Sequence, residues 1–547
     1  MPQARRKTPF SGKAKKQQLQ VKKQNKTLLM STSSNTNPYD VVSVNYQPNR
    51  SRGRGDANRY ALKFYRETDE ELKLKKEEAL KSLNPVSERE MEIDPKDFFP
   101  NEVSFPKRPP WDFSMTPAQL DAQEQKYFRE YIQNIQNSEN WKDMSYFELN
   151  LETWRQLWRV LEMCDILLLI VDVRFAGMMF PPSLYEYVVN EQKKNMILVL
   201  NKIDLVPASL VAAWKEYLVT NCPGLRVVYF TSCPGYNLAG GSNDKAGLQV
   251  RRRKGRQRMC AEGATKLLEA CKDIVKNEVD LTSWEKKIKE ETNVEFDEDE
   301  TEVGETILEK ADTTYYTHEK YKNGILTIGC VGQPNVGKSS LMNAIMGKKV
   351  VSVSKTPGHT KHFQTIFLTP QVRLCDCPGL VFPSRVSRSI QILMGSYPIA
   401  QLREPYTTIR YIAERINLPL LLRIDHPEND DTWSPRDICD GWAKKRGYLT
   451  AKAARLDTYR AANAILRMAL DGKICLWLRP PKFTEKREKY ENCEELKYIK
   501  WVQALTEEDG EISLSDSERT NSEQSSGETD EDEHTEIANK FAALANE

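Results

Sequence analysis

The stretch "GQPNVGKSS" at residues 332–340 has the spacing Gly-x-x-x-x-Gly-Lys-Ser, which suits phosphate binding. It lies between an apolar stretch typical of a strand and a stretch typical of a helix, which is the context that this motif needs. In such a loop, backbone amides converge on phosphate oxygens at a helix N-terminus. We expect Lys338 to bridge the terminal phosphates and the Ser339 hydroxyl to hold Mg²⁺. The alternative is a glycine-rich turn that binds no ligand.

A second candidate, "DCPG" at residues 376–379, follows the strand-like residues "VRLC". An Asp at a strand end can hold Mg²⁺ through water, so Asp376 is another candidate metal ligand. The backbone N–H of Gly379 can donate to a terminal phosphate. Asp-x-x-Gly alone is a common turn. Its position one hairpin after the phosphate-binding loop favours the functional interpretation.

The stretch "TPGHT" at residues 356–360 lies between these two motifs and is predicted to be a loop. A Thr in a mobile loop can ligate Mg²⁺ only when the terminal phosphate is present. We choose Thr360 for this role, with Thr356 as the alternative. Lys338, Thr360 and Gly379 are then the groups expected to act on the terminal phosphate.

Residues 201–204, "NKID", end another apolar stretch and suit the recognition of a base. The Asp204 carboxylate can accept hydrogen bonds from the ring N–H and the exocyclic amino group of guanine, a pair that adenine lacks. A buried site built on such a pair rejects the wrong partner by roughly 10⁴-fold or more. We expect Asn201 to contact the other edge of the base and the Lys202 stem to pack on it. "TSC" at residues 231–233 ends the next strand and can supply backbone contacts.

These candidates all lie where a predicted strand ends, and ligands bind outside the carboxyl ends of the strands in open α/β sheets. The site therefore requires that residues 153–235 and 325–385 fold as one sheet. The predicted nucleotide-binding residues are Asn201, Lys202, Ile203, Asp204, Thr231, Ser232, Cys233, Gly332, Gln333, Pro334, Asn335, Val336, Gly337, Lys338, Ser339, Asp376, Cys377, Pro378, Gly379 and Leu380. The predicted metal ligands are Ser339, Thr360 and Asp376.

Strand-like and helical stretches alternate along the chain, which predicts an α/β fold with a mostly parallel sheet and helices on both faces. Strands are expected at residues 165–173, 195–200, 226–232 and 325–331, with a hairpin at residues 366–377. Helices are expected at residues 153–164, 208–220 and 262–278, and from Pro181 and Lys338 onward.

The order of the motifs is unusual. Ordinary GTPases run from the phosphate loop through the switch Thr and Asp-x-x-Gly to Asn-Lys-x-Asp, whereas here Asn-Lys-x-Asp comes first. This order indicates a circular permutation, which domains tolerate because their termini lie close together.

With "NLETWRQLWRVLEM", "VLNKIDL", "GCVGQPNVGKSSL", "VVSVSKTPGHT", "LCDCPGL" and "DICDGWAKKRGY", the sequence resembles the circularly permuted GTPases of the bacterial YlqF and eukaryotic nucleolar type. The resemblance covers residues 100–480. It implies GTP binding and hydrolysis to GDP, and a nucleotide-dependent switch in ribosome or ribonucleoprotein assembly.

Two residues bear on the rate of hydrolysis. Ras-type enzymes carry a Gln just after Asp-x-x-Gly to orient water, whereas this chain has Leu380, which cannot. Intrinsic turnover is therefore expected to be slow. Asn335 matches the position at which related GTPases with a hydrophobic substitution coordinate K⁺, and such a cation would compensate charge in the transition state. The alternative for Asn335 is a hydrogen bond within the loop.

The chain is divided by composition into charged ends and an apolar-patterned middle. The predicted division is a basic disordered tail (1–60), an N-terminal extension without an assigned role (61–150), the first half of the GTPase domain (151–238), a charged insert (239–320), its second half (321–386), a helical domain (387–478) and an acidic disordered tail (479–547). Contacts of the terminal phosphate at Thr360 and Gly379 are expected to reposition the helical domain.

The 547-residue chain has a formal net charge of +2, which hides its basic N-terminal and acidic C-terminal ends. Its eleven cysteines lack a framework spacing and are expected to be reduced core thiols. The longest apolar run, "ILLLIVDV", is far shorter than the roughly 20 residues that a bilayer needs, so we expect an intracellular soluble protein without a membrane partner.

The basic segments, including "RRRKGRQR", could bind RNA or a ribosomal particle, or could be import signals that bind the import machinery. We prefer import for the N-terminal tail, which predicts a nuclear or nucleolar protein that is also cytoplasmic in part. The first hypothesis is a GTP-hydrolysing assembly switch. The alternatives are a GTP-binding scaffold with negligible hydrolysis, which Leu380 favours, and a GTPase in signalling.

Overall fold

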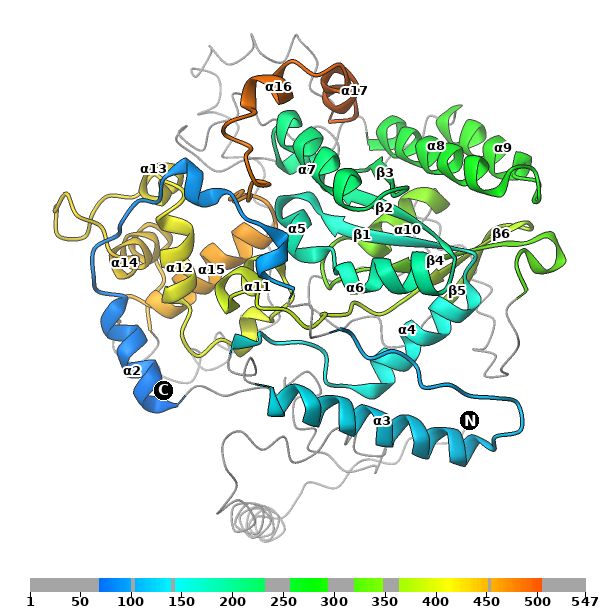
Figure 1. Cartoon of the computed structure of the whole chain (residues 1–547). Coiled ribbons are helices and arrows are strands. Elements are labelled where there is room, and N and C mark those ends of the chain that lie inside the picture. The colour runs from blue at the N-terminus through cyan, green and yellow to red at the C-terminus, as the bar shows by residue number, and fades with distance from the viewer. Residues whose placement is uncertain are drawn as a thin grey trace, which may run out of the picture.

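A six-stranded sheet lies at the centre of the computed structural model, which describes residues 68–99, 104–138, 143–231, 256–293, 319–347, 364–450 and 454–503 (Figure 1). The strand order is β3-β2-β1-β4-β6-β5. The strands are β1 (Ile166–Asp172), β2 (Asn195–Asn201), β3 (Arg226–Tyr229), β4 (Leu326–Val331), β5 (Gln364–Thr369) and β6 (Val372–Asp376).

The sheet joins two parts of the chain that are far apart in sequence. β1 pairs in parallel with β2 and with β4, so the β1–β4 contact joins the two parts. β6 is parallel to β4, and only β5 is antiparallel to its neighbour. The prediction that both parts form one mostly parallel sheet is confirmed, as is the hairpin. The circular permutation itself stays a prediction from the order of the motifs.

Helices cover both faces of the sheet. Every residue of β1 and β4 is therefore buried. α4 (Leu151–Met163) packs on β4, and α5 (Ala176–Met179) packs on β1. α7 (Ala208–Asn221) and α8 (Arg256–Val275) pack on β3, and α10 (Lys338–Met346) packs on β6 and α8. The helix expected from Pro181 is α6 (Pro182–Tyr185), which continues as one π-helical stretch, η5 (Glu186–Glu191).

A group of helices follows the last strand and lies beside the sheet in Figure 1. It comprises α11 (Arg388–Met394), α12 (Tyr406–Ala413), α13 (Leu418–Leu422), α14 (Pro435–Arg446) and α15 (Thr458–Leu470). α2 (Asp69–Glu78), from the N-terminal extension, packs on α12. Arg410 donates to the carbonyl oxygens of Glu78 (2.6 Å), Lys81 (2.7 Å) and Ser82 (2.9 Å). The N-terminal extension therefore contributes a helix to this group.

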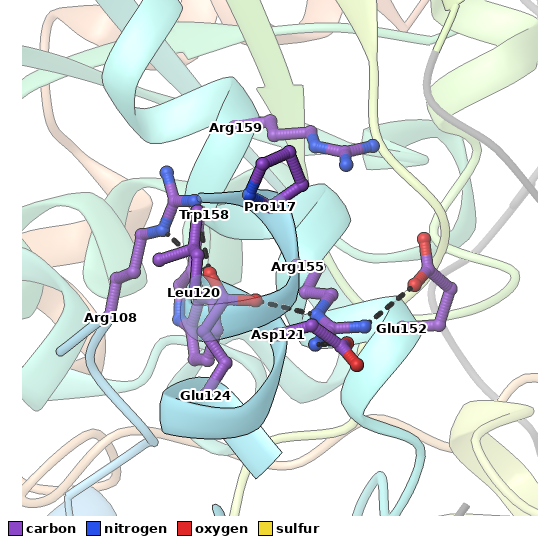
Figure 2. Close-up of a pocket in the computed structure, with 9 residues that line it drawn as sticks. All are labelled: Arg108, Pro117, Leu120, Asp121, Glu124, Glu152, Arg155, Trp158 and Arg159. Carbon is purple, nitrogen blue, oxygen red and sulfur yellow. Dashed lines mark hydrogen bonds and ion pairs between the residues drawn. The ribbon is translucent and has the colours of Figure 1, made fainter. Parts of the chain in front are cut away.

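A second part of the N-terminal extension, α3 (Pro117–Asn137), lies against α4 through buried charges. Glu124 is 3% exposed and accepts hydrogen bonds from Arg108 (3.0 Å) and Arg155 (2.7 Å). A cavity of about 190 Å³ opens beside these groups (Figure 2). The arginines and carboxylates around it neutralise one another, which indicates a structural junction.

The third part of the N-terminal extension holds the segment that follows Asp-x-x-Gly. The Ser145 N–H and hydroxyl both donate to the Ser384 carbonyl oxygen at 2.9 Å, and the Glu148 N–H donates to the Val381 carbonyl oxygen at 3.0 Å. The ring of Phe382 makes edge contacts with Phe105 and Trp154 at centroid distances of 5.9 and 5.7 Å. The extension, for which the sequence predicted no role, therefore fixes the link between β6 and α11.

One predicted boundary is wrong, and one helix was not predicted. Residues 479–503, expected to begin the disordered acidic tail, form α16 (Arg487–Glu491) and α17 (Glu495–Val502), because Leu496, Ile499 and Val502 bury an apolar face. The charged insert, where the sequence predicts one helix at residues 262–278, contains a second helix, α9 (Thr282–Asn293), which packs on α8. The tails beyond the described residues, 1–60 and 504–547, stay predictions.

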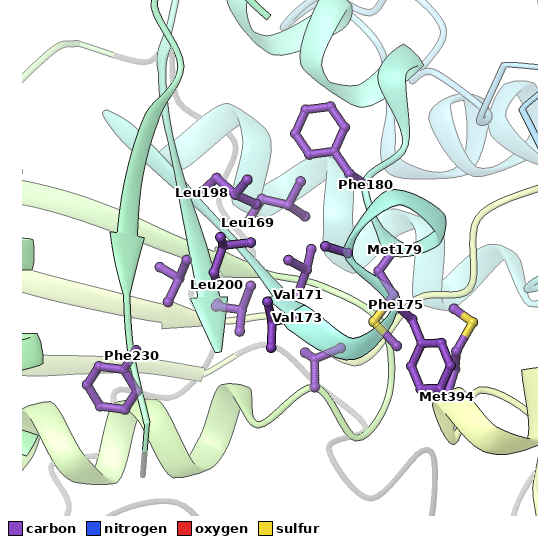
Figure 3. Close-up of a cluster of buried hydrophobic side chains, with 14 of the residues drawn as sticks. Leu169, Val171, Val173, Phe175, Met179, Phe180, Leu198, Leu200, Phe230 and Met394 are labelled. Atoms are coloured by element: carbon purple, nitrogen blue, oxygen red, sulfur yellow. The ribbon is translucent and has the colours of Figure 1, made fainter. Parts of the chain in front are cut away.

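The apolar core continues from the sheet into the helical group (Figure 3). Leu169 and Val171 of β1 face the same cluster as Leu198 and Leu200 of β2. The cluster reaches Met394 at the end of α11. Among the described residues, no helix is both long and apolar enough to cross a membrane.

Phe382 tests whether the N-terminal extension is part of this core. Its side chain is 2% exposed, so Phe382→Ala should lower the free energy of unfolding by about 3–5 kcal/mol in urea titration. Phe113→Ala is a matched control, because Phe113 is 63% exposed and its loss should change stability by less than about 0.5 kcal/mol. Equal midpoints for the two variants would show that the extension is not packed as described.

Candidate functional site

The loop between β4 and α10 lies against the ends of β1 and β2, and two of its glycines are required by close contacts. A Cβ at Gly332 would lie 2.4 Å from the Ile170 carbonyl oxygen. Gly337 has φ +99°, and a Cβ there would lie 2.4 Å from the Asn201 amide nitrogen. The predicted spacing of this loop is therefore enforced by the neighbouring strands.

Lys338 begins α10 and curls back over the loop. Its ammonium group donates to the carbonyl oxygens of Gly332 (3.0 Å) and Gln333 (2.8 Å). Burial lowers its pKa, while the nearby carboxylate of Asp376 opposes that shift. The side chain is held where phosphate oxygens would approach the first turn of α10.

Asp376 ends β6 beside Lys338, and its environment fits a bound cation. It is completely buried, and neither of its carboxylate oxygens has a hydrogen-bond partner among the described residues. Burial raises its pKa to about 6, although Lys338 acts in the opposite direction. A buried carboxylate without partners is costly, and a divalent cation would compensate it. Asp376 and Ser339, in the first turn of α10, are the described residues that would hold Mg²⁺ bound to a nucleotide.

The Asn-Lys-x-Asp motif (residues 201–204) at the end of β2 is hydrogen-bonded to the phosphate loop. The Asn201 amide donates to the Val336 carbonyl oxygen at 2.7 Å, and the Lys202 ammonium donates to the Asn335 carbonyl oxygen at 2.7 Å. These contacts bring together residues from the two distant parts of the chain. Their predicted contacts with the base itself stay predictions.

Asp204 lies in the short helical turn of residues 203–205 and is 2% exposed. One of its carboxylate oxygens accepts a hydrogen bond from the Thr231 hydroxyl at 2.7 Å. Thr231 therefore contributes its side chain, whereas the sequence suggested only backbone contacts. Ser232, Cys233 and both candidate switch threonines, Thr356 and Thr360, lie outside the described residues.

The Asp-x-x-Gly loop packs directly on the phosphate loop. A Cβ at Gly379 would lie 2.9 Å from the backbone of Pro334, and the Leu380 N–H donates to the Gly332 carbonyl oxygen at 3.2 Å. Cys377 is completely buried and its N–H donates to the Cys330 carbonyl oxygen at 3.2 Å. Pro378 completes this loop between the two. Leu380 is also completely buried, so its side chain is part of the core.

The sequence reasoning missed an ionic group beneath this site. Asp172, at the end of β1, accepts hydrogen bonds from the Arg174 guanidinium (2.8 Å) and the Lys202 ammonium (2.8 Å). These two cations hold the pKa of the fully buried carboxylate well below its usual range, against the effect of burial. Arg174 also donates to the Ala469 carbonyl oxygen of α15 at 2.9 Å. The polar pair that ends an otherwise apolar run, "ILLLIVDVR", was the available signal.

The phosphate loop also contacts the helical group. The Gln333 side-chain oxygen accepts from the Ser396 hydroxyl at 2.6 Å, and the Asn335 amide donates to the Gly395 carbonyl oxygen at 3.0 Å. Ser396 and Gly395 directly follow α11. The cavity of Figure 2 is a different place, since it is lined by Arg108 and residues of α3 and α4 and by none of the predicted nucleotide-binding residues.

The fold and these contacts define a P-loop nucleotide-binding protein with an Asn-Lys-x-Asp motif beside the phosphate loop. The family described as 50S ribosome-binding GTPase matches residues 327–423. Guanine nucleotide-binding protein-like 1 of Rattus norvegicus is 45% identical over 531 residues, which are 89% of this chain and 87% of the relative, and that of Homo sapiens gives the same figures. This chain belongs to the family of guanine nucleotide-binding protein-like 1 and is a GTPase.

A more distant relative is the large subunit GTPase 1 of Schizosaccharomyces pombe, which is 32% identical over 70% of this chain and 59% of its own length. The solved structure of GNP-bound YlqF from T. maritima is 17% identical, and the match covers 60% of this chain and 98% of that one with a TM-score of 0.34. This structural likeness is weak and adds nothing to the assignment.

The burial of Asp376 can be tested through protein stability, without a measurement of GTP hydrolysis. Its folded pKa of about 6 lies above the usual value of 3.8, so the folded state gains stability from proton uptake at low pH and loses it as pH rises through 6. In EDTA and without nucleotide, Asp376→Asn should therefore stabilise the protein, by about 1–3 kcal/mol at pH 8 and by less at pH 5. Urea titration at both pH values measures this effect.

The exposed Asp431 supplies the control, because Asp431→Asn should leave the free energy of unfolding unchanged at either pH. The same Asp376→Asn variant should lose the extra stability that Mg²⁺ and GDP together give to the wild type. A pH-independent effect of Asp376→Asn would contradict the assignment of an uncompensated buried carboxylate.

Proposed function

We propose that this GTPase is a nucleotide-dependent switch in ribosome or ribonucleoprotein assembly. One observation carries the proposal: the phosphate loop is hydrogen-bonded to the residues after α11 through Gln333 and Asn335. A change in this loop on exchange of GTP for GDP would therefore reach the helical group directly. The description of the matching family, 50S ribosome-binding GTPase, and the name of one relative, large subunit GTPase 1, support a ribosomal partner.

A second route between the nucleotide and the helical group runs through the Asp-x-x-Gly loop. Gly379 lies against Pro334 of the phosphate loop, and the chain continues from there to α11. A terminal phosphate that binds the Gly379 N–H, with Thr360 as the second contact, would tighten this loop. The N-terminal extension is hydrogen-bonded to the following segment at Val381 and Ser384, so a movement of this loop would act on the extension as well as on the helices beyond it.

We also assign the remaining roles within this proposal. Mg²⁺ would be held by Ser339 and Asp376, with Thr360 joining them in the GTP state. K⁺ would bind near Asn335, whose amide nitrogen donates to Gly395 and whose amide oxygen is the group that would ligate a cation. The basic N-terminal tail would serve nuclear or nucleolar import, and the basic segments would contact RNA phosphates.

One alternative has support from a specific contact. Leu380 is completely buried and its N–H is bonded to the Gly332 carbonyl oxygen, so this residue cannot position the attacking water. Without K⁺ or a partner that supplies the missing group, the protein would act as a GTP-binding scaffold with very slow turnover. A role in signalling has no comparable support among the described residues.

Single-turnover hydrolysis in KCl and in NaCl, with ATP as competitor, tests the enzyme and the cation role together. We expect turnover to be at least ten-fold faster in KCl and unaffected by ATP, since a correctly placed cation compensates transition-state charge. Asn335→Ala should remove the difference between the two salts. The alternative role of Asn335, as a hydrogen bonder to Gly395, predicts that the variant hydrolyses GTP at the wild-type rate in KCl.

Hydrogen exchange of residues 387–471 tests the switch. We expect the amides of these helices to be protected differently in the GDP state and with a non-hydrolysable GTP analogue. The reason is that Gly395 and Ser396, which follow α11, are hydrogen-bonded to Asn335 and Gln333 of the phosphate loop. Gln333→Leu should reduce this difference, and Gln401→Leu, in the same helical group, is the control. Identical exchange in both states would exclude the switch. Co-sedimentation with ribosomal particles only in the GTP state would support the assembly role.

A further inference from the structure

The last described residue of the chain, Gln503, reaches into the guanine-reading loop. It directly follows α17 and is 1% exposed. Its side-chain amide nitrogen donates to the carbonyl oxygens of Ile203 (2.6 Å) and Val206 (2.9 Å). Because both partners are carbonyl oxygens, the nitrogen of the amide must face them. One side chain therefore ties down the backbone on both sides of Asp204.

α17 is firmly placed for this contact. Leu496, Ile499 and Val502 bury one face of the helix, which packs on α7 and α8. At its other end, Glu495 forms an ion pair with Lys215 of α7 and accepts a hydrogen bond from the Tyr229 hydroxyl at 2.9 Å. The helix is thus held at both ends, and Gln503 reaches the loop from a rigid support.

The position of the Asp204 carboxylate decides how well it reads guanine. One of its oxygens already accepts from the Thr231 hydroxyl, which sets the side chain. The backbone that carries it is a single helical turn of residues 203–205, entered through Lys202 in a left-handed conformation with φ 60°. Such a short turn has few internal hydrogen bonds, so an outside group that holds its carbonyl oxygens fixes its orientation.

We propose that Gln503 is a positioning residue for guanine specificity, and that α17 completes the base-reading site. This inference rests on the assignment of Asp204 as the residue that reads guanine. Gln503 does not touch the base in this proposal. It holds the loop so that the Asp204 carboxylate meets both the ring N–H and the exocyclic amino group.

The comparison of GDP with inosine diphosphate isolates this role, because inosine lacks only the exocyclic amino group. Wild-type protein should bind GDP roughly ten-fold or more tightly than inosine diphosphate, as expected for a hydrogen bond to a carboxylate. Gln503→Met keeps the volume of the side chain but has no N–H to donate. We expect it to reduce the ratio of the two affinities about five-fold, measured by calorimetry.

Four further variants separate a positioning role of Gln503 from a role in folding alone. Lys500→Ala, on the exposed face of α17, should keep the wild-type ratio. Gln503→Asn retains an amide that is too short to reach both carbonyl oxygens, so it should reduce the ratio even if Gln503→Met proves too unstable to purify. Asp204→Asn should remove most of the preference for GDP, and adding Gln503→Met to it should then change the ratio no further.

The outcomes distinguish this proposal from the site on which it rests. A wild-type protein without preference for GDP would show that Asp204 does not read guanine. A clear wild-type preference that Gln503→Met and Gln503→Asn leave unchanged would overturn the positioning role. An equal loss of affinity for GDP and for inosine diphosphate would overturn the positioning role as well. Such a result would show that α17 only supports the fold.

Discussion

The carboxylate of Asp172 is the constraint on which the nucleotide site depends. It is completely buried and shared by two cations, Arg174 and Lys202. A buried charge is tolerated only when it is paired and hydrogen-bonded, so these three side chains fix one another. Through them the end of β1 is joined to the Asn-Lys-x-Asp motif, to the phosphate loop at Asn335, and to α15 at Ala469. The site is thus centred on an ionic group that need not touch the nucleotide.

This arrangement explains how a chain with its motifs in an unusual order makes one site. The site requires that the carboxyl ends of β1, β2, β4 and β6 meet, and it places no condition on the order in which the chain visits them. The parallel pairing of β1 with β4 brings these strand ends together. The contacts of Asn201 and Lys202 with the phosphate loop then lock the two parts together.

Sequence patterns predicted the strands well because the buried strands are short apolar runs that end in polar motif residues. The phosphate loop and the Asp-x-x-Gly loop could be predicted for the same reason, since their residue types are dictated by close backbone contacts at Gly332 and Gly379. Gln503 could not be found in this way. Its role depends on a contact about 300 positions away in the sequence, and its segment was assigned to a tail because acidic residues follow it.

The same limit applies to the N-terminal extension. Ser145 and Phe105 act on residues near position 382, and nothing in their local sequence indicates this. The helices α16 and α17 escape prediction for another reason. The charged composition of their segment hides a regular apolar face at Leu496, Ile499 and Val502. Composition averages over a segment, whereas burial depends on the few side chains that face a neighbour.

The distance in sequence between β1 and β4 has a consequence for the synthesis of the protein on the ribosome. β1 ends at residue 172, and β4, which covers its open edge, begins at residue 326. At about 5–20 residues per second, translation leaves that edge unpaired for on the order of ten seconds. An apolar strand with a free edge is a template for aggregation. The nascent chain should therefore need chaperone protection during this interval.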